Sequence, residues 1–103
     1  VVNMPQLTIV YWRDIPAQVI VKAGRKSAKR QLPDRYQQAI DAAAMQAGAA
    51  DTDAYLNDWR RGDAEDVEGD IEDLAGAAVA EIEAACGTDR LKVLIANGGY
   101  EMQ

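Results

Sequence analysis

Residues 6–22 read QLTIVYWRDIPAQVIVK, and this stretch indicates the fold class. It contains two runs of β-branched, aromatic and aliphatic residues, Leu7–Trp12 and Gln18–Val21, separated by a short segment that includes Pro16. Such runs are typical of strands. Proline suits a turn because its ring fixes φ and it has no amide hydrogen to donate. The sequence therefore predicts a β-hairpin over residues 6–22, with its connection at Asp14-Ile15-Pro16.

Three or four helices are expected after the hairpin. Leu32-Pro33-Asp34 is a suitable start for a helix that ends at Gly48. A second helix of about three turns is expected from Asp51 or Thr52 to Gly62. The longest helix is expected from Asp63, paired with Asp66 in a capping arrangement, to Cys86. Its apolar stripe consists of Val67, Ile71, Leu74, Ala78 and Ile82.

Two features of the C-terminal half leave alternatives open. Within the longest helix, Gly76 could permit close backbone packing, and Gly69 could mark a kink. Residues 90–96 fit either a helix or a third strand. The helix is favoured because Asn97-Gly98-Gly99 makes a plausible stop.

Together these elements predict a single two-layer α/β domain of the α+β type over residues 1–103. The hairpin, with a third strand as the open alternative, packs against three to four helices, because an isolated hairpin is barely stable in water. The expected parts are the hairpin at 6–22, a basic loop at 23–32 and a helical part at 33–97.

Charge is unevenly distributed along the chain. Residues 1–35 carry seven basic and two acidic side chains, whereas residues 36–103 carry four basic and fifteen acidic ones. Segment 23–32 and the preceding Lys22 hold five of the seven basic residues of the first half and show no hydrophobic period, which predicts an exposed loop. The two halves can neutralise one another within the fold, or the basic segment can steer a charged partner.

The composition argues against metal and cofactor chemistry. Histidine is absent, which removes the commonest general base and metal ligand. Cys86 is the only cysteine, and its place near a helix C-terminus predicts a core thiol and no nucleophile. The acidic residues of segment 63–73 lack the spacing of a calcium loop, because Ala64 stands five residues before Gly69, where a carboxylate is needed. We therefore expect no catalytic residues, no metal and no cofactor.

No segment of the sequence is typical of a membrane protein. The longest apolar run, around Val19–Val21, is far shorter than the roughly 18 residues that a membrane span needs. Residues 1–12 show no basic start followed by an apolar stretch, as a secretory leader would. The expectation is a cytoplasmic protein without membrane contact.

The first half of the chain resembles a known family. Residues 7–21, 28–41 and, more loosely, 55–61 resemble a family of small bacterial proteins named "virulence factor", with residues 11–19, YWRDIPAQV, as the most specific mark. The family name describes no reaction. Relatives encoded beside folate- and corrinoid-dependent methyl-transfer proteins imply an accessory role in one-carbon metabolism.

The sequence favours a non-catalytic accessory or protein-interaction domain whose partner is another protein and whose contact surface is the basic loop and hairpin turn. The candidate contact residues are Arg13, Asp14, Gln18, Arg25, Lys26, Lys29, Arg30, Arg60 and Arg61. The first alternative is a subunit of a folate or corrinoid methyl-transfer system, or a histidine-free enzyme that uses carboxylates. The second is a nucleic-acid-binding module, which the pI of about 4.5 disfavours.

One structural criterion separates these alternatives. A concave pocket that holds a carboxylate with a raised pKa would favour the enzyme, and a flat surface with an exposed Trp12 would favour the binding domain. The expectation from composition is that Trp12 and Trp59 are core or core-rim residues.

Overall fold

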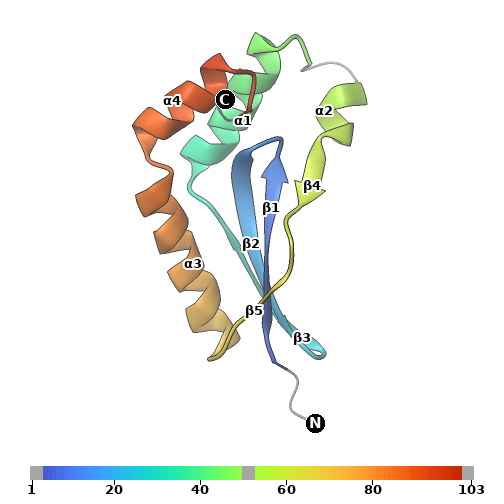
Figure 1. The fold of residues 1–103 in the computed structure, drawn as a ribbon, viewed down its shortest axis with the longest axis vertical. Helices are drawn as coiled ribbons and strands as arrows, with labels where there is room; N and C mark the ends of the chain where they lie inside the picture. The colour runs from blue at the N-terminus through green and yellow to red at the C-terminus, as the bar shows by residue number, and fades with distance from the viewer. Residues whose placement is uncertain (1–3, 50–52, 101–103) are drawn as a thin grey trace.

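The computed structural model describes residues 4–49 and 53–100, and this part of the chain contains four helices and five strands (Figure 1). In chain order these are β1 (Gln6–Trp12), β2 (Ile15–Ala23), β3 (Lys26–Gln31), α1 (Asp34–Gln46), α2 (Asp53–Asn57), β4 (Trp59–Arg61), β5 (Glu65–Asp66), α3 (Ile71–Ala85) and α4 (Thr88–Ala96). The strands form one antiparallel sheet in the order β3-β2-β1-β4, with β5 pairing to the start of β1. The predicted α+β class is confirmed.

The helices cover the sheet unequally. Helix α3 lies along one face, over β2 and β3, while α1 and α4 pack on each other at the upper end of the molecule in Figure 1. A core cluster at that end includes the fully buried Trp12, Tyr36 and Ile40. A second cluster lies between α3 and the sheet around Val19 and Val21. Fully burying each such large side chain stabilises the fold by about 1.5–3 kcal/mol.

The first hairpin is confirmed, but its connection is not where the sequence predicted it. Pro16 lies inside β2 opposite Tyr11, so the turn consists of Arg13 and Asp14 alone. The strand register shifts between Val10 and Tyr11. Such an irregularity explains how the sheet accepts a proline, because bulges are among the few strand positions that do not require its missing amide hydrogen.

The prediction of a basic loop at residues 23–32 is wrong, because most of this segment forms a strand. Strand β2 continues to Ala23, the chain turns at Gly24 and Arg25, and β3 returns along β2. Only Ala28 of β3 is buried, beneath α3. Because the side chains of the other β3 residues are exposed, the strand shows no apolar alternation, and its sequence resembles that of a loop.

The second and third helices are shorter than predicted. The expected start at Asp51 or Thr52 lies outside the described residues, and α2 ends at Asn57 because Trp59–Arg61 pairs with β1 as β4. Residues 65–66 also pair with β1, as β5, so α3 is capped by Asp70 and not by Asp63. Gly69 has a φ of +130°, which a helix cannot contain, and it therefore stands before the helix and does not kink it.

The remaining helix predictions are confirmed. Helix α1 begins with Asp34 after Pro33, and Gly48 stops it with a φ of +72°. Residues 90–96 belong to α4, so the extra strands come from elsewhere in the chain. None of the described helices is long and apolar enough to cross a membrane.

Gly76 does not mediate close packing. It is exposed, and no neighbouring heavy atom lies within 4 Å of the position that its Cβ would occupy. We expect Gly76→Ala to raise the free energy of unfolding by about 0.5–1 kcal/mol, because alanine favours the helix and restricts the unfolded chain. Urea denaturation would measure this gain. Ala77→Gly, at the exposed neighbouring position, should give a loss of similar size, and a loss for Gly76→Ala would contradict the prediction.

Candidate functional site

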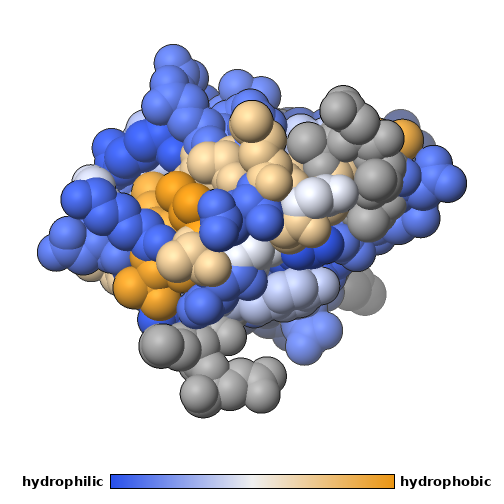
Figure 2. Space-filling model, turned by 90° about the horizontal axis from the view of Figure 1, so that it is seen from above, coloured by the Kyte–Doolittle hydropathy of each residue, from blue (hydrophilic) through white to orange (hydrophobic). Residues whose placement is uncertain are grey.

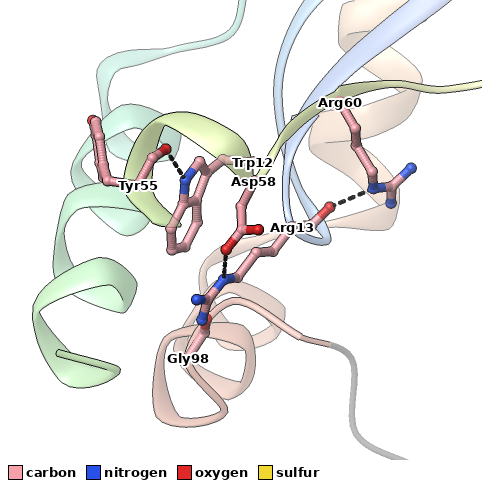
Figure 3. Close-up of polar contacts among 6 residues, drawn as sticks. All are labelled: Trp12, Arg13, Tyr55, Asp58, Arg60 and Gly98. Carbon is pink, nitrogen blue, oxygen red and sulfur yellow. Dashed lines mark hydrogen bonds and ion pairs between the residues drawn. The ribbon is translucent and has the colours of Figure 1, made fainter. Parts of the chain in front are cut away.

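The turn between β1 and β2 is tied to two distant segments by the side chain of Arg13 (Figure 3). Its Nε lies 2.8 Å from Asp58 Oδ2, and its Nη1 donates a 2.7 Å hydrogen bond to the carbonyl oxygen of Gly98. The guanidinium carbon lies 4.6 Å from the centre of the Trp12 ring and 4.8 Å from that of Tyr100. Only 11% of the side chain is exposed. Arg13 is therefore engaged mainly within the chain.

The backbone strengthens the same connection. The amide of Arg13 donates to the carbonyl of Asp58 at 3.1 Å, and the amide of Asp14 donates to that of Gly99 at 2.8 Å. Arg13 has a positive φ of 54°, and every other described residue with a positive φ is a glycine. A non-glycine residue holds this conformation only where its surroundings enforce it. We call Arg13, Asp58, Gly98 and Gly99 the clasp.

Asp14 and Arg60 lie beside the clasp, on the surface. Arg60 Nη2 lies 3.1 Å from Asp14 Oδ1, and Arg60 Nε donates a 2.9 Å hydrogen bond to the carbonyl of Arg13. The Arg60 guanidinium also stacks on Tyr11, at 4.5 Å from the ring centre. Of the nine contact residues predicted from the sequence, the structure thus groups Arg13, Asp14 and Arg60 at the turn.

Four of the predicted contact residues gather at the opposite end of β2. These are Arg25, Lys26, Lys29 and Arg30. With Lys22 they form what we call the basic hairpin, residues 22–30, which comprises the end of β2, the turn and most of β3. All five side chains are exposed, and residues 15–33 contain no acidic residue.

Only one described ion pair involves the basic hairpin. Arg30 Nη2 lies 3.0 Å from Glu72 Oε1 on α3, whereas Arg25, Lys26 and Lys29 have no ion pair within the described residues. The hypothesis of neutralisation within the chain therefore holds for Arg30 but does not account for the other charges. Such an exposed pair contributes about 0.2–1 kcal/mol.

Gln18 and Arg61 lie on the sheet face opposite α3. Strand pairing places Arg61, Val10, Gln18 and Gln31 in one row across the sheet. No residue of this row is fully buried. A groove of about 400 Å³ beside it is bounded by Trp59 and by side chains of β1–β3 and α1. The face therefore offers a shallow polar surface between the clasp and the basic hairpin.

A second groove, of about 550 Å³, lies on the side of α3 and α4. Tyr11, Asp14, Cys86 and Arg90 contribute to its walls. Cys86 caps the C-terminus of α3 and packs, half-buried, against the core cluster, so it lies at the rim of the core and not within it as predicted. Its backbone carbonyl accepts a hydrogen bond from the hydroxyl of Tyr36.

Two tyrosines act as hydrogen-bond donors within the core and its rim. Burial, and then the nearby Cys86, raise the pKa of Tyr36 above its ordinary value. Burial, and then the carboxylate of Asp41, raise the pKa of Tyr55. Both hydroxyl groups therefore stay protonated near neutral pH, and Tyr55 donates to Asp41 at 3.2 Å. Neither group is suited to act as a base.

The upper end of the molecule differs from the basic hairpin in character. Figure 2 looks onto this end and shows hydrophobic surface beside hydrophilic side chains. Exposed large hydrophobic residues there include Met45 of α1, Leu56 of α2 and Val93 of α4. Trp12 itself is fully buried, so the flat surface with an exposed Trp12 is not found.

The comparison with known families agrees with the sequence resemblance. A model of the family described as "Virulence factor" matches residues 10–95, which include Arg13, Asp58 and the whole basic hairpin. The chain belongs to the virulence factor family. No curated protein and no solved structure matches the chain. The virulence factor family name specifies no chemistry.

Among the described residues of this virulence factor family member, no group of three or more cysteine, aspartate or glutamate side chains is arranged to hold a metal ion. The sequence did not predict that Asp58, Gly98 and Gly99 contact Arg13. The pair Gly98-Gly99 indicated only the end of a helix, and nothing in the sequence marked Asp58.

Proposed function

We propose that the chain is a non-catalytic protein-interaction domain that binds an acidic partner protein through the basic hairpin. The observation that carries this proposal is the positive charge of Arg25, Lys26 and Lys29, which no described carboxylate neutralises, on a chain of net charge −6. Charge of one sign concentrated on an otherwise acidic body increases the association rate and selects partners of complementary charge.

Neutralising two of these charges tests the proposal. We expect Lys26→Gln/Lys29→Gln to change the free energy of unfolding by less than about 0.5 kcal/mol, because these side chains make no ion pair within the described residues. Capture of partners from a lysate of the native host should fall sharply. A purified partner should bind the wild-type chain less tightly as salt increases.

A matched control keeps the change of net charge the same. Arg35→Gln/Lys92→Gln removes two exposed positive charges from α1 and α4, away from the basic hairpin. It also removes the exposed ion pair between Arg35 and Glu83, which costs about 0.2–1 kcal/mol of stability. This variant should retain every wild-type partner. If both variants lose the same partners, or if neither does, the basic hairpin is not the contact surface.

A nucleic acid is the competing ligand for a basic surface, and we expect no specific binding to it. The fifteen acidic residues of segment 36–103 repel phosphates, which opposes the attraction of the hairpin. Fluorescence anisotropy with DNA and RNA at physiological salt should give no dissociation constant below about 1 µM, which is tighter than the usual range for non-specific binding. Sub-micromolar binding that Lys26→Gln/Lys29→Gln abolishes would replace the proposed partner with a nucleic acid.

A further inference from the structure

Strand β3 lies at the edge of the sheet, with β2 on one side and no described strand on the other. An edge strand presents backbone amide and carbonyl groups that an extended segment can pair with. We infer that β3 binds an extended acidic segment of the partner as an additional strand of the sheet. This inference rests on the proposed function, because it specifies how the basic hairpin engages its acidic partner.

The side chains of β3 define what such a segment must carry. Lys26, Ala28 and Arg30 lie on the side of α3, since Ala28 is buried beneath that helix and side chains alternate along a strand. Ser27 and Lys29 lie on the opposite, open side. Residues directly opposite one another in neighbouring strands interact, and opposite charges there are stabilising. Acidic residues are therefore favoured opposite Lys26 and Lys29, one on each side of the sheet.

The position opposite Arg30 differs. Glu72 already pairs with Arg30, so an acidic residue placed there would meet the Glu72 carboxylate. A neutral polar residue fits that position better, and a small apolar residue fits opposite Ala28, beside α3. An antiparallel segment that follows this pattern reads Thr-Gln-Glu-Val-Thr-Glu, opposite residues 31 to 26 in that order.

The same charges disfavour a second copy of the chain as the occupant. Two β3 strands pairing with each other would bring their lysines and arginines together, and like charges directly opposite are destabilising. Lysines on edge strands are a common protection against such pairing. The positive charge of β3 therefore disfavours pairing with a second copy of the chain and favours pairing with an acidic strand.

The test uses the full chain and synthetic peptides that contain Thr-Gln-Glu-Val-Thr-Glu between neutral flanks. Peptide binding is followed by NMR of the ¹⁵N-labelled chain. We expect the largest shifts at the amides of Lys26–Gln31, and at least a tenfold weaker affinity when lysine replaces both glutamates of the peptide. The variant Lys26→Gln/Lys29→Gln should weaken binding by a similar factor.

N-methylation of the peptide separates strand addition from simple charge attraction. In an added strand, alternate amides point towards β3 and the others point away. Two peptides methylated on opposite sets of amides should therefore differ at least tenfold in affinity. Equal affinity of the two peptides, with the charge effect intact, overturns strand addition and leaves the proposed function standing.

The remaining outcomes are also decisive. Failure of the unmethylated peptide to bind at millimolar concentration overturns the inference about β3, while the partner capture described above decides the proposed function separately. Peptide binding that is weakened neither by the two lysines in the peptide nor by Lys26→Gln/Lys29→Gln also overturns the inference, because the charges of β3 would then contribute nothing to binding.

Discussion

Replacing Gly99 with alanine is expected to lower the free energy of unfolding by about 3 kcal/mol. Gly99 has a φ of +97°, which a side chain disfavours, and a Cβ there would lie 2.9 Å from Cζ3 of Trp12 and 3.2 Å from Cδ of Arg13. Neither neighbour can move easily. Trp12 is fully buried and donates a 2.8 Å hydrogen bond to the carbonyl of Tyr55, and Arg13 is held by the clasp. Urea or thermal denaturation would measure the loss.

Gly48→Ala is the matched control for this variant. Gly48 also has a positive φ, +72°, but no neighbouring heavy atom lies within 4 Å of the place of its Cβ. Only the backbone cost of about 1–2 kcal/mol then applies. The difference between the two variants measures the close approach of Gly99 to Trp12 and Arg13. Equal losses would mean that the close approach of Gly99 to Trp12 and Arg13 contributes nothing to the cost of the alanine side chain.

Local sequence signals were sufficient where an element depends on its own residues. The β-branched runs around Pro16 predicted the first hairpin, and Gly48 ended α1 as expected. The alternating and helical patterns report burial within one element. They therefore predicted the fold class and the extents of α1 and α4.

The misassigned segments are those that become strands only by pairing with another strand. Lys26–Gln31 becomes a strand because it pairs with β2, which directly precedes it. Trp59–Arg61 becomes a strand because it pairs with β1, which is far away in sequence. Neither segment carries enough apolar residues to indicate this locally. The candidate site shows the same limit. The sequence marked Arg13 as a residue of interest, but its partner Asp58 is 45 positions away, and no spacing rule relates the two.

The second large effect is expected for Arg13→Ala, which should lower the free energy of unfolding by about 2–3 kcal/mol. Removing one member of a buried ion pair costs about 3–5 kcal/mol, and the figure is lower here because 30% of the Asp58 side chain is exposed. The substitution also removes the hydrogen bond to the Gly98 carbonyl and the contact with the Trp12 ring. Arg13→Lys keeps the charge but not the planar group that reaches both acceptors, so an intermediate loss is expected.

Arg13→Gly distinguishes the side chain from the backbone. Glycine removes every atom that alanine removes and one more, yet it tolerates the φ of 54°. We therefore expect it to be less destabilising than alanine by about 1 kcal/mol. If glycine proved the worse of the two, the conformation of Arg13 would not be strained and the clasp would act through its side-chain contacts alone.

Arg13→Lys also separates the clasp from the proposed function. The clasp and the basic hairpin lie at opposite ends of β2, so a change at Arg13 that leaves the chain folded should not alter the surface around Lys26 and Lys29 (Figure 1). We expect the folded Arg13→Lys variant to capture the same partners, and to bind the acidic peptide with the same affinity, as the wild-type chain. Loss of binding in a variant with native circular dichroism would instead make Arg13 part of the contact surface, and the proposal would have to move from β3 to the turn.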